Sequence, residues 1–229
     1  MLPQKILLVD DEAGIRDLLR AYLEREGYVV RTAADGRAAL EEAERFQPHL
    51  VILDLMLPEL DGLEVCRCLR VNSPAYIIML TVKAEETDVL VGLGVGADDY
   101  ITKPFSPREV VARVKAVLRR ARNETPSAPL FFPGLTVDSE RRQVLRDGRP
   151  LELTAREFDL LWFLARHAGR VFTREELLDG VWGYDFPGGT RTVDVHMGNL
   201  RRKLEGEATG CRFIQTVRGV GYRFGEAPR

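Results

Sequence analysis

The sequence predicts two domains of different fold class, an α/β domain at residues 1–121 and an α+β domain at residues 130–229. In the first half, apolar strand-like runs alternate with amphipathic segments about five times, which predicts a doubly wound, five-stranded parallel sheet. Residues 122–129 lose this periodicity and contain Asn, Thr, Ser and Pro, a composition typical of a linker. The second half shows short strands and helices separated by turn residues.

Composition is that of a soluble globular protein, with 229 residues, 45% of them hydrophobic and 30% charged. No apolar run approaches the ~20 residues of a membrane span, and the first five residues lead directly into a predicted strand without a signal peptide. We therefore expect a cytoplasmic protein with no membrane partner. Of the three cysteines, Cys66 and Cys68 lie two apart in a predicted helix and do not face each other, so neither a metal nor a redox role is expected.

The first half contains five apolar runs that predict strands, at residues 6–9, 28–33, 50–53, 76–80 and 99–102. The run 50–53 is continuous, as in a strand buried on both faces, and ends in Asp54. Helices are predicted between the strands from apolar residues at helical spacing. Those positions are Ile15, Leu18, Leu19, Tyr22 and Leu23; Ala39, Leu40, Ala43 and Phe46 after a cap at Asp35; Leu63, Cys66 and Leu69; Leu90 and Leu93; and Val110, Val111, Val114, Val117 and Leu118.

Polar residues stand where four of these strands end, namely Asp10 with Asp11, Asp54, Thr81 and Lys103. Ligands bind at the carboxyl ends of parallel strands, so we expect these side chains to converge. Three carboxylates together favour a hard cation such as Mg²⁺, and a lysine and a hydroxyl beside them suit a phosphoryl group. Other interpretations remain: Asp11 as a helix cap and Thr81 as a turn residue.

The motifs Val9-Asp10-Asp11, Asp54-Leu-Met-Leu-Pro58, Leu80-Thr81 and the stretch from Gly96 to Phe105 resemble the receiver domain of bacterial two-component response regulators, which has a flavodoxin-like fold. The resemblance implies that Asp54 accepts phosphate from a histidine kinase. It implies a site for Mg²⁺ (or Mn²⁺) formed by Asp10, Asp11, Asp54 and the backbone carbonyl of Met56. It also implies that Lys103 and Thr81 contact the phosphoryl group, that Tyr100 rotates inward, unless Tyr100 is only a surface aromatic, and that the Lys103-Pro104 bond is cis.

The second half predicts strands at residues 130–137 and 143–153, with Asp147-Gly148 as a hairpin turn. Two capping boxes, Thr154 with Glu157 and Thr173 with Glu176, begin helices. A third helix at residues 190–204 precedes strands at 213–217 and 222–224 that flank a tight turn at 218–221. Three helices followed by a hairpin describe a winged helix. The predicted inward residues are Phe158, Leu161, Trp162 and Leu164; Leu177, Leu178, Val181 and Trp182; and Val193, Met197, Leu200 and Leu204.

The third helix carries side chains suited to DNA. The first 121 residues have more acidic than basic residues, whereas residues 190–223 have more basic ones. We expect the face turned away from the core to carry Arg191, Thr192, Val195, His196, Asn199 and Arg202, which include types that contact bases. Phosphate contacts are expected from Arg201, Arg202 and Lys203, and a minor-groove contact from Arg218. A basic helix face can also be an ordinary solvated surface, so the pattern alone leaves DNA binding open.

Four stretches resemble the output domain of OmpR/PhoB-type regulators: residues 154–158, 181–183, 191–204 and 217–223. The whole chain thus resembles one family, which implies a homodimer after phosphorylation, promoter DNA as ligand and RNA polymerase as a partner. The implied dimer face lies on the segments 87–94, 99–102 and 107–120 and includes Val89, Asp98, Asp99, Glu109, Arg113, Lys115 and Arg120. Val89 and Gly94 stand where many relatives have charged residues. In the third helix, Gly198 and Asn199 stand where relatives often have Arg or other long polar residues.

Together these features predict a phosphorylation-activated, DNA-binding transcriptional regulator that does not turn over a substrate. One alternative is a Mg²⁺-dependent phosphohydrolase of the haloacid-dehalogenase type, which also uses an aspartyl nucleophile. Such enzymes carry a second Asp two residues after the first, where this chain has Met56. The other alternative is a protein-interaction module that never binds DNA, which the basic face at residues 191–203 disfavours.

Overall fold

The computed structural model describes residues 3–82, 95–123, 128–183, 189–205 and 213–225. The chain forms two compact units, Met1–Arg120 and Ala121–Arg229. The last helix of the first unit, α5, continues to Asn123, so the first two residues of the predicted linker are helical. Within the described residues, no helix is long and apolar enough to cross a membrane.

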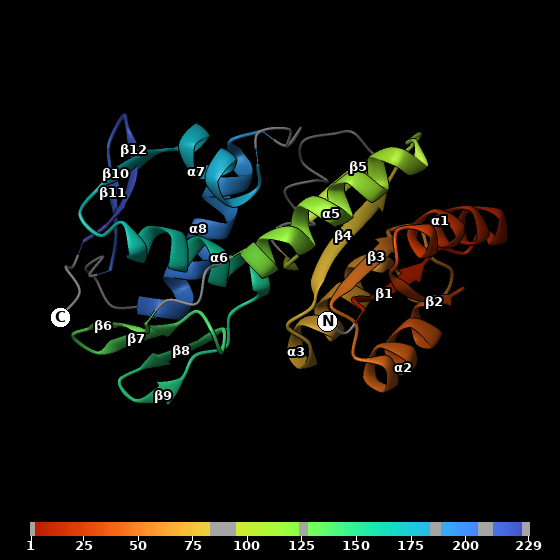
Figure 1. Ribbon diagram of the computed structural model, residues 1–229, viewed down its shortest axis with the longest axis horizontal. Coiled ribbons are helices and arrows are strands. Elements are labelled where there is room, and N and C mark those ends of the chain that lie inside the picture. The colour runs from red at the N-terminus through yellow and green to blue at the C-terminus, as the bar shows by residue number, and fades with distance from the viewer. Residues whose placement is uncertain (1–2, 83–94, 124–127, 184–188, 206–212, 226–229) are drawn as a thin grey trace. The chain divides into compact units, whose positions relative to one another are not determined.

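The first unit is a five-stranded parallel sheet in the order β2-β1-β3-β4-β5, which confirms the predicted fold class (Figure 1). Its elements are β1 Lys5–Val9, α1 Ala13–Arg25, β2 Val29–Ala33, α2 Gly36–Phe46, β3 Leu50–Asp54, α3 Gly62–Asn72, β4 Tyr76–Thr81, β5 Asp99–Thr102 and α5 Pro107–Asn123. The helix predicted at residues 87–94 lies outside the described residues.

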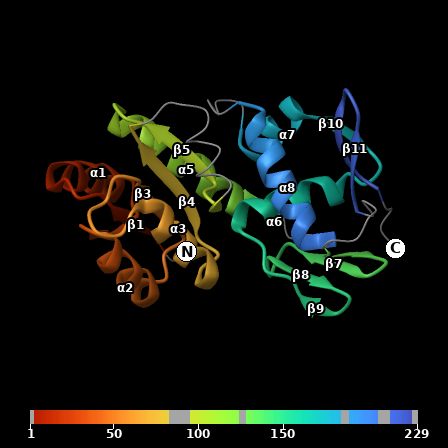
Figure 2. The same cartoon turned by 180° about the vertical axis from the view of Figure 1, so that it is seen from behind.

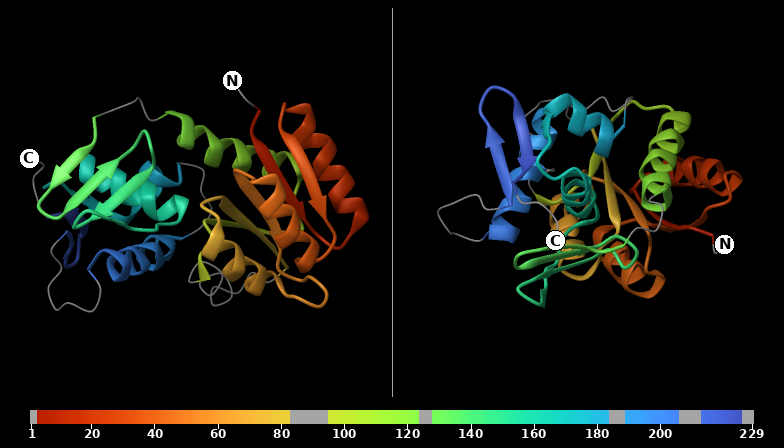
Figure 3. Two further views of the ribbon diagram at one scale, coloured as in Figure 1. Left: turned by 90° about the horizontal axis from the view of Figure 1, so that it is seen from below. Right: turned by 60° about the vertical axis from the view of Figure 1, so that its left-hand side comes forward.

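Helices cover both faces of this sheet, with α1 and α5 on one face and α2 and α3 on the other (Figures 1 and 3). The central strands β3 and β4 are buried along their whole length, as the continuous apolar runs predict. Lys115 of α5 and Glu26 at the end of α1 form an ion pair of 2.5 Å, which links the two helices on their shared face.

The buried stripe of α1 is narrower than predicted. Leu19 and Leu23 are buried, whereas Leu18 is 48% exposed and Tyr22 is 37% exposed. A helix on a flat sheet buries only the residues nearest the sheet, so the outer members of an apolar stripe stay in solvent. In α3, Val65 is buried with Cys66 and Leu69, and Leu63 is only half-buried.

Cys66 is a core residue, as predicted, and burial raises the pKa of its thiol to about 11. Since the thiolate is the nucleophile, a raised pKa makes this side chain inert. We expect iodoacetamide at about pH 8 to leave Cys66 unmodified in the native protein and to modify it in urea. Peptide mass spectrometry with the half-exposed Cys68 as internal reference measures this. Equal labelling of Cys66 and Cys68 without denaturant would contradict the prediction.

The second unit contains two antiparallel sheets around three helices, and its parts form a winged helix. The sheets have the strand orders β6-β7-β8-β9 and β10-β12-β11. The elements are β6 Leu130–Phe132, β7 Leu135–Asp138, β8 Gln143–Arg146, β9 Arg149–Pro150, α6 Ala155–Arg166, β10 Val171–Thr173, α7 Arg174–Val181, α8 Arg191–Glu205, β11 Ile214–Val217 and β12 Gly221–Phe224.

Two strand predictions in this unit were wrong. The segment 130–137 is a hairpin rather than one strand, because Gly134 adopts φ +78° and turns the chain between β6 and β7. The short strand β10 was missed, because three residues are too few to show an alternating pattern. The Asp147-Gly148 turn is confirmed by φ values of 50° and 78°.

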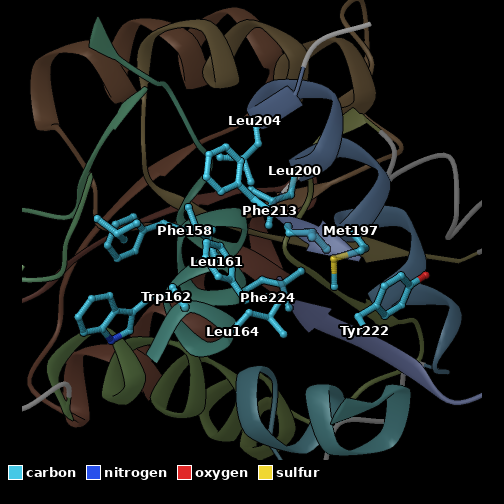
Figure 4. Close-up of a cluster of buried hydrophobic side chains, with 14 of the residues drawn as sticks. Phe158, Leu161, Trp162, Leu164, Met197, Leu200, Leu204, Phe213, Tyr222 and Phe224 are labelled. Atoms are coloured by element: carbon cyan, nitrogen blue, oxygen red, sulfur yellow. The ribbon is translucent and has the colours of Figure 1, made fainter. Parts of the chain in front are cut away.

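The helices of the second unit begin as predicted. Both capping boxes are formed, with Thr154 and Thr173 each accepting from the N–H of the glutamate three residues later. Helix α8 crosses α6 (Figure 2) and also packs against α7. The core between them contains Leu161, Met197 and Phe224 among others, and Tyr222 lies at its edge (Figure 4).

Candidate phosphorylation site and DNA-binding surface

Three carboxylates converge at the carboxyl edge of the parallel sheet. Asp10 follows β1, and Asp54 ends β3. With Asp11 they place one carboxylate oxygen each within 4.8 Å of one another. Asp10 and Asp54 are buried and Asp11 is exposed, so the cluster opens to solvent on the side of Asp11. The predicted convergence of these residues is therefore confirmed.

Lys103 binds two of the carboxylates directly. Its Nζ donates to Asp54 Oδ2 over 2.6 Å and to Asp10 Oδ2 over 3.1 Å. Burial opposes its charge, but the bonds to both carboxylates outweigh burial and raise the pKa of the ammonium above its ordinary value. The backbone N–H of Lys103 donates to the carbonyl of Thr81 over 2.6 Å, which fixes the lysine to the end of β4. The Lys103-Pro104 peptide is cis, as predicted.

The acidic turn after β1 is held by contacts that sequence reasoning missed. Arg16 of α1 donates from Nη1 to the carbonyl of Asp10 over 2.6 Å, and the N–H of Glu12 donates to Asp10 Oδ1 over 2.9 Å. Burial raises the pKa of the Asp10 carboxyl, although the Glu12 N–H and Lys103 act in the opposite direction. An arginine three residues after a helix start carries no signal of this contact in the sequence.

The loop that carries Asp54 is closely packed. The N–H of Met56 donates to Asp54 Oδ1 over 3.1 Å, and the N–H of Gly62 donates to the carbonyl of Leu55 over 3.1 Å. A Cβ at position 62 would lie 2.2 Å from the carbonyl oxygen of Asp54, so only glycine allows this approach. Asp61 caps α3 through the N–H of Glu64. The position of the Asp54 carboxylate is thus determined by the backbone on both sides.

The two predicted switch residues lie on neighbouring strands in different environments. Thr81 is buried at the end of β4, next to the strand that carries Lys103. Tyr100 is half-buried on β5, and its N–H donates to Asp99 Oδ1 over 2.7 Å. The carbonyl of Thr81 accepts from the N–H of Lys103, so Thr81 lies beside the cluster.

Part of the predicted dimer face is buried inside the first unit. Asp98 has no exposed surface, because its carboxylate accepts from Arg70 of α3 and from the N–H of Ile77. Asp99 is also buried and pairs with Arg113 over 3.3 Å. These carboxylates stabilise the fold, so their assignment to an exposed face is corrected. Glu109 and Lys115 are exposed, whereas Val89 and the side chain of Arg120 lie outside the described residues.

Two residues expected on the outer face of α8 are buried instead. Thr192 and His196 are each at most 2% exposed, and the ring of His196 lies 5.3 Å from that of Trp182. Helix α8 packs against both α6 and α7, so its buried stripe is wider than its hydrophobic residues indicate. The predicted residues that reach solvent on α8 are Arg191, Val195, Asn199, Arg201, Arg202 and Lys203.

Two of the basic residues on α8 bind other parts of the unit. Arg201 donates to the carbonyl of Ile214 and to Oγ1 of Thr216, both on β11. Lys203 donates over 2.7 Å to Oε2 of Glu157, the capping-box carboxylate of α6. Arg202 is exposed, and Arg218 is exposed in the turn between β11 and β12. Among the residues predicted to contact phosphate or the groove, Arg202 and Arg218 therefore project into solvent.

Comparisons with known proteins identify both domains of the chain. Residues 6–115 match the response regulator receiver domain, and residues 148–224 match the transcriptional regulatory protein C-terminal domain. The alkaline phosphatase synthesis transcriptional regulatory protein PhoP of Bacillus subtilis is 49% identical, and the DNA-binding response regulator MtrA of Mycobacterium tuberculosis is 47% identical. Each alignment covers 97% of both chains.

Solved structures show the same arrangement of domains along the chain. A RitR mutant matches with a TM-score of 0.82 at 31% identity, covering 98% of this chain and 100% of that one. DrrB of Thermotoga maritima, described as an OmpR/PhoB homolog, matches with a TM-score of 0.53 at 36% identity and the same coverage. This chain therefore belongs to the OmpR/PhoB-type two-component response regulators, a family of phosphorylation-dependent, DNA-binding transcription regulators.

Proposed function

We propose that Asp54 accepts a phosphoryl group from a histidine kinase and that the phosphorylated chain then binds promoter DNA through α8 and the wing. The observation that carries this proposal is the cluster of Asp10, Asp11 and Asp54 with Lys103 2.6 Å from Asp54. A carboxylate with a fixed cation beside it can accept a phosphoryl group whose added negative charge the cation then offsets.

In the transfer, an Asp54 oxygen attacks phosphorus while the bond from phosphorus to the imidazole nitrogen of the kinase histidine breaks. The imidazole leaves with its electron pair, and Asp54 becomes an acyl phosphate. The Asp54 side chain is only 3% exposed beneath Lys103, so the donor reaches it when the ammonium moves from Asp54 to the incoming phosphoryl oxygens. Thr81, buried at the next strand end, then supplies a hydroxyl to the same oxygens.

The donor set of this site fits Mg²⁺ or Mn²⁺. Asp10, Asp11 and Asp54 offer only oxygen atoms, which such hard cations prefer. The backbone carbonyl of Met56 is the proposed fourth ligand and is also an oxygen. When bound, the cation supplies positive charge that neutralises the carboxylates and the phosphoryl oxygens. Lys103 alone offsets part of the cluster's negative charge, and the exposed Asp11 leaves one side open to the ion.

Turnover hydrolysis is the weaker proposal for this site. The side chain two residues after Asp54 is Met56, which is 60% exposed and has no proton to transfer. Without a second carboxylate there, water is not activated for attack on the acyl phosphate. We therefore favour a receiver that promotes its own phosphorylation over an enzyme that turns over phosphoesters.

We propose that phosphorylation acts through Thr81 and Tyr100 to favour a homodimer that binds two half-sites about one DNA turn apart. The face proposed for that dimer keeps Glu109 and Lys115, which are exposed on α5. RNA polymerase is the proposed partner at the promoter, and the site of action is the cytoplasm, where a bacterial promoter and a histidine kinase's phosphorylated domain are both accessible.

Intact mass and solution molar mass test this proposal, measured with and without Mg²⁺ and a small phosphodonor such as acetyl phosphate. We expect one phosphoryl adduct that requires Mg²⁺, together with a shift from monomer to dimer. An adduct without the shift would support phosphorylation and contradict the dimer. The absence of any adduct with Mg²⁺ and donor present would contradict phosphorylation at this site.

The salt dependence of DNA binding separates basic residues that contact phosphate from those that hold the fold. Arg202→Ala and Arg218→Ala are each expected to lower the slope of log K against log salt by about 0.9. Lys203→Ala is expected to leave that slope unchanged, because Lys203 pairs with the buried carboxylate of Glu157. Fluorescence anisotropy over a salt series measures the slopes.

Lys203→Ala should instead lower the free energy of unfolding of the second unit by about 1–3 kcal/mol, since a buried charged acceptor loses a partner. Tryptophan fluorescence in urea reports this loss, because both tryptophans, Trp162 and Trp182, lie in that unit. A slope change for Lys203→Ala as large as that for Arg202→Ala would show that Lys203 contacts DNA after all.

A further inference from the structure

One carboxylate on the helix proposed to bind DNA is held by two donors from other elements. Asp194 lies in the first turn of α8. Its Oδ1 accepts from the hydroxyl of Tyr222 on β12 over 2.7 Å and from Nε of Arg174, the first residue of α7, over 2.8 Å. Figure 4 shows the Tyr222 hydroxyl directed away from the hydrophobic core. One oxygen atom thus joins α7, α8 and the wing.

The ring of Tyr222 is contacted by two arginines. The guanidinium groups of Arg174 and Arg201 each lie 5.2 Å from its centroid. Burial, and then the bond to Asp194, raise the pKa of the Tyr222 hydroxyl, so it remains a donor at neutral pH. We name Asp194, Arg174, Tyr222 and Arg201 the helix–wing clamp.

The clamp holds α8 to both strands of the wing. Asp194 binds β12 through Tyr222, and Arg201, two helical turns further along α8, binds Ile214 and Thr216 of β11. The exposed Arg218 lies in the turn that these two strands form, two residues after Thr216. The clamp therefore links α8 to both of the strands that carry the tip of the wing.

The charge of Asp194 is unfavourable for DNA binding in itself. Its side chain is 40% exposed on a helix proposed to approach DNA phosphates, where a negative charge is repelled. A carboxylate at this position weakens DNA binding unless it also has a structural role that outweighs the repulsion. The bonds that its Oδ1 accepts from Arg174 and Tyr222 indicate such a role.

We propose that Asp194 is a positioning residue for DNA recognition, which through the helix–wing clamp holds α8 and the wing at the spacing needed to contact one DNA site together. This inference rests on the proposed DNA-binding function. Without the bonds of Asp194, the wing is still held to α8 by Arg201 and by core packing, but the two contact regions are less well preorganised as one surface for DNA.

Whether Asp194→Ala weakens or tightens DNA binding distinguishes a positioning residue from an acidic residue that only repels DNA. Removal of a negative charge that only repels DNA tightens binding. Removal of the clamp weakens binding to a specific duplex by about tenfold, the effect of losing hydrogen bonds to a charged group. Tyr222→Phe keeps the ring and its packing and loses only the hydroxyl, so it tests the same bond without a change of charge.

The probes are a duplex selected by the wild-type chain from a random-sequence library and an unrelated duplex of equal length. We expect Asp194→Ala and Tyr222→Phe to weaken binding to the selected duplex. Binding to the unrelated duplex should stay unchanged for Tyr222→Phe and should become slightly tighter for Asp194→Ala, which also removes a charge that repels phosphates. The salt slope of Tyr222→Phe should equal that of the wild type, and the double variant should lose no more than either single variant. Glu175→Ala, which removes an exposed charge beside Arg174, is the matched control and should not weaken binding.

Three results would overturn the inference: clamp variants that bind the selected duplex as tightly as the wild type, losses that add in the double variant, or a reduced salt slope for Tyr222→Phe. The last would make the Tyr222 hydroxyl a phosphate contact. Failure of the proposed function looks different, because then the wild type selects no duplex and Arg202→Ala has no effect. Thermal unfolding of each variant confirms that the second unit is folded at the assay temperature.

Discussion

Asp54→Ala is expected to abolish phosphoryl uptake completely. Asp54 is the carboxylate that Lys103 contacts at the shorter distance, 2.6 Å against 3.1 Å for Asp10. Its backbone is held by Gly62 and its side chain by the N–H of Met56, so no neighbouring carboxylate can take its place without moving a strand end. Intact mass after incubation with Mg²⁺ and acetyl phosphate measures the loss.

The matched control is Asp61→Ala, which removes a carboxylate from the same loop outside the cluster. Asp61 caps α3 through the N–H of Glu64 over 2.8 Å, so this variant should lose about 1 kcal/mol of stability. It should still accept one phosphoryl group. A stoichiometric adduct that persists in Asp54→Ala would refute the assignment of Asp54 and direct attention to Asp10 or Asp11.

Arg70→Met is expected to cause the largest loss of stability, about 3–5 kcal/mol, because it removes the Arg70 guanidinium from the buried carboxylate of Asp98. The Asp98 side chain has no exposed surface and that of Arg70 is 9% exposed. The guanidinium also donates to the carbonyl of Gly96 over 2.7 Å and to that of Ala75, so it ties α3 to the segments before β4 and β5.

Urea unfolding followed by two signals can locate this loss in the first unit. Far-UV circular dichroism reports both units, whereas tryptophan fluorescence reports the second unit alone, since it contains both tryptophans. Arg70→Met should shift an early transition seen by circular dichroism and leave the fluorescence transition unchanged. Arg20→Met, which breaks an exposed ion pair with Glu24, should change neither transition appreciably. If the fluorescence transition of Arg70→Met shifted together with the circular dichroism transition, the loss of stability would not be confined to the first unit.

The order of strands and helices follows from local patterns, and so does the position of the acidic site. Continuous apolar runs such as residues 50–53 predict strands with both faces covered. Because parallel strands end at one edge, Asp10, Asp54 and Lys103 could be expected to meet before any coordinates were known. The two capping boxes were likewise visible three residues apart in the sequence.

The dimer face and the DNA surface were predicted less well, because the spacing of apolar residues in the sequence does not show which polar residues are buried. Asp98 was expected at the surface, and Arg70, its partner, lies 28 residues earlier in the chain. Thr192 and His196 were expected to face DNA, yet both are buried, and the ring of His196 packs against Trp182 at the end of α7.

The sequence by itself determined the two fold classes, the caps and the residues that meet at the acidic site. Only the tertiary structure decided which polar side chains form hydrogen bonds within the protein, as Arg16, Lys203 and Asp194 do. The physical reason is range: backbone conformation and apolar spacing depend on neighbours a few residues away, whereas the partner of a buried charge is set by elements that become neighbours only when the chain has packed.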